Sequence, residues 1–395
     1  MAVTETPTGS TYRLSREHDE LRALVRQLAD ERIAPRAAEI DEKSEFPWDL
    51  KQLLAEQDLL GTGFEERYGG TALDGIGQAI VVEEIARADA TTSLIPVIQK
   101  LGALPIMLAG TEEQKERYFP RLASGEWLPA FCLTEAGAGS DVASMRMRAV
   151  RDGEDYLLTG TKRFITGGSV ANVLTVFALT DADAGGRRGM SGFIVETDTP
   201  GFSVARLEHK MGIRGSPTAE LVFDEVRVPA ANRLGEEGEG FKIAMSTLDR
   251  SRLAIAAQAV GIAQGAIDAA LAYAAERRQF ESRIVDFQAI QFMLADMASQ
   301  TEAARQLVYV ACTRVDDEDP NLAYWTSCAK LIAGDTAMRV TTDAVQIFGG
   351  YGYVTDYPVE RMMRDAKITQ LYEGTQQIQR LVIARRLLSR AGVGR

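Results

Sequence analysis

The sequence predicts a mostly helical protein with a β-domain at its centre. Apolar residues recur at three- and four-residue spacing near both ends of the chain, which is the period of an amphipathic helix. Between about Trp127 and Pro229, apolar and polar residues alternate and turn residues are frequent, which is typical of strands. We therefore expect a helical domain over residues 1–126, a β-domain over 127–234 and a helical bundle over 235–395.

The N-terminal domain is expected to contain only helices. Apolar spacing predicts a first helix that includes residues 21–28 and bends or ends near Pro35. Further helices are expected over 77–87 and from Thr111, which is a good N-cap with a glutamine three residues later. Pro96 is expected to mark a break.

The two following domains differ in the spacing of their apolar residues. Five strands are predicted in the β-domain, over 156–160, 174–179, 192–196, 203–207 and 221–228. Four helices are predicted after the Gly- and Glu-rich linker 235–240, over about 241–277, 287–313 and 321–348 and after Thr375. Their apolar stripes predict an antiparallel four-helix bundle.

Composition limits the classes of partner. The 395-residue chain has a formal net charge of −12, which argues against nucleic acid and an anionic membrane surface. Three scattered cysteines fit reduced thiols in the cytoplasm, and two distant histidines predict no metal site. The N-terminus shows no signal peptide, and the apolar stretch 253–275 contains polar residues that favour a buried helix over a membrane span.

Glu373 is the main candidate for a catalytic base. It follows Leu371 and Tyr372, and a carboxylate beside apolar bulk loses hydration, which raises its pKa. Gly374 permits a sharp turn or a close ligand, and Thr375 can cap the helix that follows. A glutamate placed at a helix start by the helix dipole would explain the same residues.

Two further motifs could hold a flat or phosphorylated ligand. In the loop 131–141, glycines and the hydroxyls of Thr134 and Ser140 could cradle a pyrophosphate, although an ordinary turn also explains the loop. The loop is not a dinucleotide-binding fingerprint, because the third glycine and a preceding strand are missing. Phe164 and Thr166 lie on one side of a strand and could face a cofactor, although a core phenylalanine is the ordinary interpretation.

Together, eight motifs resemble the acyl-CoA dehydrogenase family of flavoproteins over essentially the whole chain. In order, these motifs cover residues 133–141, 164–166, 210–218, 277–280, 287–290, 346–350, 364–367 and 372–375. The resemblance implies a helical N-terminal domain, a middle β-barrel and a C-terminal four-helix bundle, assembled as a homotetramer that is a dimer of dimers. It also implies FAD between the barrel and the bundle.

The resemblance assigns roles to individual residues. By similarity, the residues expected to bind FAD are Phe131, Leu133, Thr134, Gly139, Ser140, Phe164, Thr166, Arg277, Phe280, Gln288, Gln346, Gly350, Thr375 and Gln377. Among these, Arg277, Phe280, Gln346 and Gly350 would reach the FAD of a neighbouring subunit. The residues expected to bind substrate are Ser140, Asp249, Arg252, Tyr372, Gly374, Ile95 and Gln99. Ile98 is expected on the pocket floor with Ile95 and Gln99, although core packing explains Ile95 and Ile98 equally well.

The implied reaction is the α,β-dehydrogenation of an acyl-CoA to the trans-2-enoyl-CoA. Glu373 would take the α-proton, its backbone N–H and a ribityl hydroxyl would polarise the thioester carbonyl, and flavin N5 would accept the β-hydride. Some relatives carry the base on the first bundle helix, where this chain has Ser251, and serine cannot act as that base. Electron-transferring flavoprotein is the implied electron acceptor.

Four residues depart from the family pattern: Ala136, Gly167, Glu281 and Tyr351. Glu281 puts a negative charge where a pyrophosphate is expected, which makes the contact of Arg277 with the cofactor less secure than that of Ser140. No arginine occurs between Ala90 and Lys100, where glutaryl-CoA dehydrogenases hold a distal carboxylate. We therefore expect a short- to medium-chain acyl group.

Three alternatives remain at this point. The same fold could serve an acyl-CoA oxidase or a flavin monooxygenase that passes electrons to oxygen. A scaffold that binds flavin or acyl thioesters without turnover is less compatible with the presence of Glu373, Thr134, Thr166 and Ser140. A carrier-protein thioester could also replace CoA.

Overall fold

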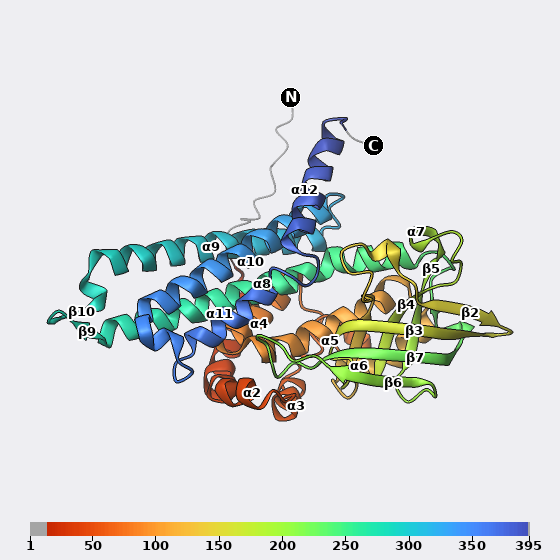
Figure 1. The fold of residues 1–395 in the computed structure, drawn as a ribbon, viewed down its shortest axis with the longest axis horizontal. Coiled ribbons are helices and arrows are strands. Elements are labelled where there is room, and N and C mark those ends of the chain that lie inside the picture. Colours follow the sequence, from red (N-terminus) through yellow and green to blue (C-terminus); the bar gives the residue numbers. More distant parts are fainter. Residues whose placement is uncertain (1–13, 394–395) are drawn as a thin grey trace.

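The computed structural model describes residues 14–393. It has helices in its N- and C-terminal parts and a β-domain between them, at one end of an elongated molecule (Figure 1). The expected order of helical, β and helical parts is therefore confirmed. The expected closed barrel is not found, for the reason given below.

The N-terminal part contains helices and no strand among its described residues. The α-helices are α1 (Arg16–Leu28), α2 (Ala37–Lys43), α3 (Trp48–Glu56), α4 (Gly75–Ala88), α5 (Ala90–Ala109) and α6 (Glu112–Ala123), with short turns η1 (Ala29–Ile33), η2 (Ala34–Arg36) and η3 (Glu66–Tyr68). Thr111 caps α6 in a complete capping box with Gln114, as predicted. The first helix ends before Pro35, also as predicted.

The predicted break at Pro96 is wrong. Pro96 and Pro105 both lie inside α5, which runs without interruption over 20 residues. Proline removes a backbone donor and crowds the preceding turn, which costs free energy in an isolated helix. Here α5 is buried for most of its length and packs against α4, α8 and β1, so tertiary packing offsets that cost.

The β-domain is one twisted, open sheet. Its strands are β1 (Pro129–Cys132), β2 (Arg148–Asp152), β3 (Asp155–Thr166), β4 (Val173–Leu179), β5 (Met190–Glu196), β6 (Phe202–Leu207), β7 (Thr218–Pro229) and β8 (Arg233–Leu234), with η4 (Val142–Ser144), α7 (Gly186–Gly189) and η5 (Ala230–Asn232) between them. The order is β6-β7-β3-β2-β4-β5-β8, and β1 pairs with β4 in parallel.

The sheet does not close into a barrel, which corrects the predicted architecture. Within residues 14–393, the two ends of the strand order, β6 and β8, do not pair with each other. β8 has only two residues and pairs only with β5, so it offers too short an edge for closure. All five predicted strands form. β1 and β8 were missed because they have only four and two residues, and the five-residue β2 was also missed.

The C-terminal part is built on one long helix. Its elements are α8 (Gly240–Glu276), β9 (Arg278–Gln279), β10 (Ser282–Arg283), η6 (Ile284–Asp286), α9 (Gln288–Asp316), α10 (Leu322–Phe348), η7 (Gly349–Tyr353), α11 (Val359–Ile368) and α12 (Gln376–Arg390). All four predicted helices form. The missed helix α11 packs against α8 and α10, while α12 packs on α10 and projects from the body (Figure 1).

α8 connects all three parts of the molecule. At 1.5 Å per residue its 37 residues span about 55 Å. Its middle and end share one apolar core with α4, α5, α9 and α10, and its first turns pack into a second core with α6 and the β-domain. The helices α5 and α8 are long and apolar enough to cross a membrane, but 72% and 78% of their most apolar windows are buried inside the protein, as expected of core helices.

Candidate active site

Glu373 lies on a tight turn between α11 and α12. Its φ is +54° and that of Gly374 is +88°, so both residues adopt the left-handed conformation. The φ of Gly374 would strain any residue with a side chain, and a β-carbon there would also lie 2.8 Å from the side-chain nitrogen of Gln379, so glycine is favoured. The non-glycine residue at positive φ stores backbone strain, and such strain is concentrated at functional sites.

Side chains of α10 and α12 hold this turn. Gln379 donates from its amide to the carbonyl oxygens of Glu373 and Gly374, at 3.1 and 2.9 Å. Lys330 of α10 is fully buried and donates to the carbonyl oxygen of Gly374 at 2.7 Å. Thr375 caps α12 by accepting from the backbone N–H of Ile378, as predicted. The turn is therefore fixed from α10 as well as from α12.

The carboxylate of Glu373 faces α8. The hydroxyl of Ser251 donates to Oε2 of Glu373 at 2.5 Å, and Arg252 donates to the carbonyl oxygen of Glu373 at 3.4 Å. Burial raises the pKa of Glu373, while the bond from Ser251 and the charges of Arg252 and Lys330 oppose this rise. The site thus combines a desolvated base with groups that favour its ionised form.

Asp249 and Tyr372 flank the base. Asp249 accepts from Arg252 at 2.6 Å, and that arginine is almost completely buried. Tyr372 donates its hydroxyl to Oε1 of Gln258, and the Gln258 amide donates to the Ala90 carbonyl and the Ser93 hydroxyl, each at 3.0 Å. The predicted substrate residues Asp249, Arg252, Tyr372 and Gly374 therefore gather around Glu373.

The two other predicted substrate residues on α5 lie in different surroundings. Ile95 packs in the core of the N-terminal helices, among residues of α1, α3 and α4. Gln99 is fully buried and donates to the carbonyl oxygens of Leu122 and Trp127. Ile98 instead approaches Gly167, where a β-carbon would lie 3.4 Å from its side chain. These contacts favour Ile98 over Ile95 and Gln99 as a pocket residue.

A buried ion pair supports the loop that follows β1. Lys162 is fully buried and donates to the carboxylate of Glu135 at 2.9 Å and to the carbonyl oxygen of Leu133 at 3.1 Å. Glu135 also accepts from the backbone N–H groups of Arg146 and Met147, at 2.7 and 3.0 Å. The backbone of Leu133 and Thr134 is thereby fixed, while Ser140 and Gly139 remain exposed.

Phe164 is the most unusual predicted cofactor residue. Its φ is +57° and 56% of its side chain is exposed, although it lies within β3. Thr166, two positions on, is half-buried, and the following Gly167 has a φ of +72°. An exposed aromatic ring on a strained strand is poorly explained as core packing and is well suited to cover a flat ligand.

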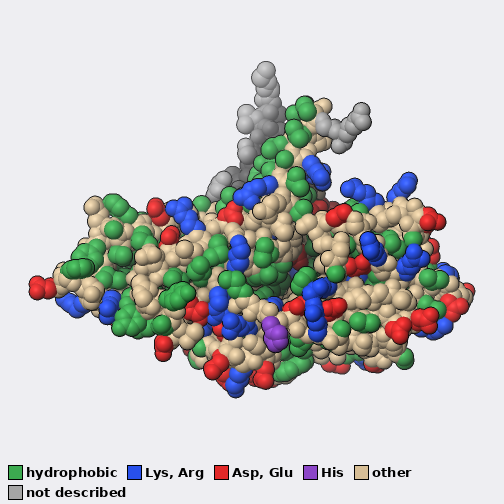
Figure 2. Space-filling view, in the orientation of Figure 1, with side chains coloured by type: hydrophobic (Ala, Val, Ile, Leu, Met, Phe, Trp, Pro, Cys, Tyr) green, Lys and Arg blue, Asp and Glu red, His purple; other side chains and the backbone are tan. Residues whose placement is uncertain are grey.

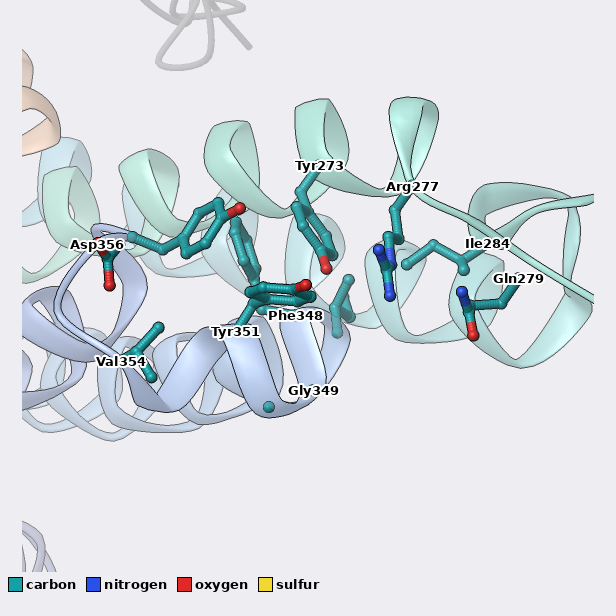
Figure 3. A pocket seen from close by; sticks show the side chains of 12 residues that line it. Tyr273, Arg277, Gln279, Ile284, Phe348, Gly349, Tyr351, Val354 and Asp356 are labelled. Carbon is teal, nitrogen blue, oxygen red and sulfur yellow. The ribbon is translucent and has the colours of Figure 1, made fainter.

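The remaining predicted cofactor residues lie at the far end of the bundle. There a groove with a cavity volume of about 820 Å³ is lined by Arg277, Gly350 and several aromatic rings (Figure 3). Tyr273 stacks on Phe348 at 4.0 Å between ring centroids, and Arg277 lies over the ring of Tyr351 at 5.1 Å. Phe280 is 89% exposed, and Gln288 and Gln346 are also exposed nearby.

The predicted cofactor residues therefore form two separate groups within one chain. Phe131, Leu133, Thr134, Gly139, Ser140, Phe164 and Thr166 belong to the β-domain, whereas Arg277, Phe280, Gln288, Gln346 and Gly350 lie around β9, β10 and the end of α10. These regions occupy opposite ends of the molecule (Figure 1). One chain does not bring both groups to a single ligand.

Both groups fit FAD. A β-carbon at Gly139 or Gly350 would meet nothing within 4 Å, so their backbones face open space. The exposed hydroxyl of Ser140 and the guanidinium of Arg277 suit a pyrophosphate, and Phe164 suits an aromatic ring system. The turn of Glu373 and Thr375, with the exposed Gln377, follows both groups in sequence and leads into α12, which lies between the two ends of the molecule (Figure 1).

The sequence did not reveal several residues that support Glu373. Lys330 and Gln379 were missed, and Ser251 was considered only as an alternative base. A signal existed for Lys330, since it is the single charged residue in the otherwise uncharged stretch 322–334 of α10. No local pattern distinguishes Gln379 from the other glutamines of α12.

The helical and β architecture, the buried carboxylate and the family matches that follow define the class of flavin-dependent dehydrogenases. The three domains of the acyl-CoA dehydrogenase family match the chain: the N-terminal domain over residues 15–126, the middle domain over 130–226 and the C-terminal domain over 238–388. The chain belongs to the acyl-CoA dehydrogenase family, whose members are FAD-dependent enzymes acting on CH–CH donors.

Individual relatives cover nearly the whole chain. A probable acyl-CoA dehydrogenase FadE25 of Mycobacterium tuberculosis is 50% identical over 97% of this chain and 98% of its own length. Cyclohexane-1-carbonyl-CoA dehydrogenase of Geobacter metallireducens is 48% identical over 93% and 96%. The solved structure of butyryl-CoA dehydrogenase from Megasphaera elsdenii superposes with a TM-score of 0.93 at 44% identity, covering 95% of this chain and 99% of the other.

Proposed function

We propose that this chain oxidises a short- to medium-chain acyl-CoA to the trans-2-enoyl-CoA, with Glu373 as the base that removes the α-proton. The observation that carries the proposal is the desolvated carboxylate of Glu373, which is held on a strained turn and bonded by Ser251. A thioester α-proton is very weakly acidic, so its removal needs a base with a raised pKa and a fixed position.

The chain's own groups account for the proton transfer. Ser251 occupies Oε2 of Glu373, which leaves Oε1 to accept the α-proton. Within residues 14–393 the backbone N–H of Glu373 makes no hydrogen bond, so it can donate to the thioester carbonyl as negative charge develops on that oxygen. The charges of Arg252 and Lys330 favour the ionised carboxylate and oppose the rise in the pKa of Glu373 that burial causes.

FAD, when bound, supplies the two-electron acceptor for the β-hydrogen, which leaves as hydride. The residues we assign to hold it are those of the two groups described above, with Leu133 and Thr134 fixed by Lys162. Because the two groups lie at opposite ends of one chain, we propose that each FAD is bound by two copies of the protein, within a homotetramer.

Our proposal for the acyl group is based on similarity to two relatives and on the hydrogen bonds next to Glu373. The similarity to butyryl-CoA dehydrogenase supports a short chain, while the similarity to cyclohexane-1-carbonyl-CoA dehydrogenase shows that related sites accept a ring. The polar groups of Tyr372 and Gln258 next to Glu373 are already bonded, to each other and to Ala90, so these two side chains do not offer a free partner for a distal carboxylate. We therefore favour an apolar acyl group.

The test is anaerobic reduction of the bound flavin by acyl-CoAs of increasing length. The loss of flavin absorbance measures the reduction. The wild-type protein should be bleached by butyryl-CoA or a close homologue. Glu373→Gln, which keeps the shape of the side chain but cannot take the proton, should slow bleaching by at least about a thousandfold. Bleaching of the variant at the wild-type rate would exclude Glu373 as the base.

The same experiment separates the proposed dehydrogenase from an oxidase. We propose electron-transferring flavoprotein as the acceptor and a cytoplasmic location. Reduced protein should therefore reoxidise slowly in oxygen and rapidly with electron-transferring flavoprotein. Rapid reoxidation by oxygen would favour an acyl-CoA oxidase or a flavin monooxygenase instead.

A further inference from the structure

The loop that joins β6 to β7, residues 208–217, connects the β-domain to the helical bundle. The backbone N–H of Ile213 donates to the carboxylate of Asp365 on α11. The carbonyl oxygen of Met211 accepts from Arg364 of the same helix at 3.0 Å. Ile213 is also buried in the apolar core that the bundle helices share. We call these contacts of Arg364 and Asp365 with the loop the α11 clamp.

The α11 clamp holds the loop tightly. A β-carbon at Gly212 would lie 2.6 Å from Oδ1 of Asp365 and 2.7 Å from the backbone of Arg364. Ile213 has a φ of +45°, which is unfavourable for a β-branched residue and persists only where the surroundings impose it. Arg364 is fixed in turn by an ion pair with both carboxylate oxygens of Asp41 on α2, at 3.0 and 2.6 Å. Basic and acidic side chains lie next to one another on the surface between α11 and β6 (Figure 2).

On one side, the α11 clamp is connected to the proposed base. α11 ends at Ile368, whose carbonyl oxygen accepts from the N–H groups of Leu371 and Tyr372, at 2.8 and 3.1 Å. Glu373 follows directly, eight positions after Asp365. One hydrogen-bonded segment therefore carries both the clamp and the base.

On the other side, the loop is connected to the strand that holds Phe164 and Thr166. Thr218, the first residue after the loop, pairs with Thr166 in the ladder between β3 and β7. The N–H of Gly167 donates to the carbonyl oxygen of Pro217, the last residue of the loop, at 2.8 Å. A displacement of the loop would therefore displace the part of β3 that we assign to hold the flavin.

Helix α5 shows how close these two sides are. Near the base, the hydroxyl of Ser93 accepts from Gln258, which is bonded to Tyr372. Near the strand, Ile98 approaches Gly167. From Ser93 to Ile98 the helix rises five residues, or about 7.5 Å. A reaction that needs groups from both sides at once loses about a hundredfold in rate when one of them is misplaced by about 1 Å.

We propose that Arg364 and Asp365 are positioning residues of the dehydrogenation. By holding the loop 208–217 against α11, they keep the flavin-binding part of β3 aligned with Glu373. One acyl group can then give its α-proton to the carboxylate and its β-hydrogen, with the bonding electron pair, to the flavin. This inference rests on the proposed function and deepens it, because it names the contacts that align the two halves of the site.

The test separates proton removal from hydride transfer on the FAD-loaded protein. Ethylthioacetyl-CoA has α-hydrogens but carries sulfur in place of the β-carbon, so it can lose a proton and has no β-hydrogen to give. In deuterated water, Glu373 takes the α-proton, exchanges it with the solvent and returns deuterium to the α-carbon. The mass of the recovered thioester measures this exchange. Anaerobic bleaching by butyryl-CoA, in contrast, needs both sides of the site.

Two variants open the α11 clamp in different ways. Asp365→Ala removes the acceptor of the Ile213 N–H, and Gly212→Ala keeps every polar group but forces the loop away from α11. Each should slow bleaching at least about tenfold more than it slows α-hydrogen exchange. Asp365→Asn is the matched control, because its amide oxygen still accepts from Ile213, and its ratio of bleaching to exchange should stay within about twofold of the wild-type ratio.

Amide hydrogen exchange of the loop measures the clamp without any turnover. The amides of residues 208–217 should exchange faster in Asp365→Ala and Gly212→Ala than in the wild type or Asp365→Asn. A mere loss of folded protein would lower bleaching and α-hydrogen exchange by the same factor. An unchanged ratio in either variant, or loop amides as protected as in the wild type, would overturn the inference. A wild-type protein that no acyl-CoA bleaches and that exchanges no α-hydrogen would instead overturn the proposed function.

Discussion

The hydroxyl of Ser251 lies 2.5 Å from Oε2 of Glu373, although the two residues are 122 positions apart in the chain. This contact joins the middle of α8 to the turn before α12. Since the hydroxyl donates to the carboxylate, it favours the ionised form of Glu373 and lowers a pKa that burial raises. Ser251 is thus positioned to orient the carboxylate of Glu373, the proposed base, and to lower its pKa.

Ser251→Ala should shift the pH dependence of turnover to higher pH. A hydrogen bond to a charged group contributes about 1.5–3 kcal/mol, which corresponds to roughly one to two pKa units. The acidic limb of the pH profile of kcat should move to higher pH by this amount, because Glu373 must be ionised to take a proton. Activity at neutral pH should fall and recover in part at alkaline pH.

Ser251→Thr is the matched control, because it keeps the hydroxyl. Its profile should stay close to that of the wild type. A merely structural role of Ser251 would lower kcat equally at all pH values and leave the position of the limb unchanged. Such a result, with the thermal midpoint of the alanine variant unaltered, would contradict the tuning role.

Gly374→Ala should damage both the turn and the activity. The residue has a φ of +88°, and the added β-carbon would lie 2.8 Å from the Gln379 nitrogen that donates to the turn. Strain of this kind costs about 1–3 kcal/mol. We expect the free energy of unfolding measured in urea to fall by that amount and flavin bleaching to slow at least tenfold.

Gly137→Ala provides the comparison for stability. A β-carbon at Gly137 would meet nothing within 4 Å, and the residue has no positive φ. Its unfolding midpoint should match that of the wild type. Equal midpoints for Gly374→Ala and Gly137→Ala would show that the turn tolerates a side chain.

The sequence predicts those parts of the fold that depend on periodicity. Long apolar stripes located α8, α9 and α10 within a few residues, and alternation located β3, β4, β5, β6 and β7. The strands β1 and β8 were missed because four and two residues are too few to show a period. Pro96 was misjudged because a local rule cannot include the burial of α5.

Part of the candidate site could also be predicted from the sequence, and part could not. Glu373, Gly374 and Thr375 were recognisable from their immediate neighbours, since a carboxylate, a turn residue and a helix cap follow each other directly. Their surroundings come from α8 and α10, through Ser251, Arg252 and Lys330. Contacts across 44 to 122 positions leave no pattern in a single sequence.

Lys162→Met should release the loop after β1. The change leaves Glu135 buried without its cation and removes the donor to the Leu133 carbonyl. Breaking a buried ion pair costs about 3–5 kcal/mol, because the remaining charge stays desolvated. We expect a lower thermal midpoint and a lower FAD content after purification, measured as the ratio of flavin to protein absorbance.

The double variant Lys162→Met, Glu135→Gln tests the cause of that loss. It removes the unpaired charge and keeps one acceptor oxygen, which can accept from only one of the N–H groups of Arg146 and Met147. Stability should recover in part, whereas FAD content should recover less, since the Leu133 carbonyl still lacks its donor. A double variant as unstable as the single one would mean that the unpaired charge is not the reason.

Asp365→Asn should change the dependence of stability on pH. Asp365 of α11 is buried and accepts from the backbone N–H of Ile213, which ties the β-domain loop to the bundle. Burial is the main cause that raises its pKa to about 7, the bond from Ile213 and the charge of Arg361 oppose this rise, and Asp89 and Asp41 add to it. Since the unfolded value is about 3.9, the native state holds this proton more tightly.

The sign follows from this difference in proton affinity. With the raised pKa, the folded state loses stability as the pH rises from about 4 to about 7, by up to roughly 4 kcal/mol for three pKa units. Asparagine accepts the same bond without ionising. The difference in free energy of unfolding between the variant and the wild type should therefore grow in favour of the variant as the pH rises from about 4 to about 7. Above that pH the difference should stay constant. Urea unfolding at pH 5, 6, 7 and 8 measures the difference, and Asp183→Asn, at an exposed position, should show none. A difference between Asp365→Asn and the wild type that is constant with pH would mean that Asp365 does not bind its proton more tightly in the folded state.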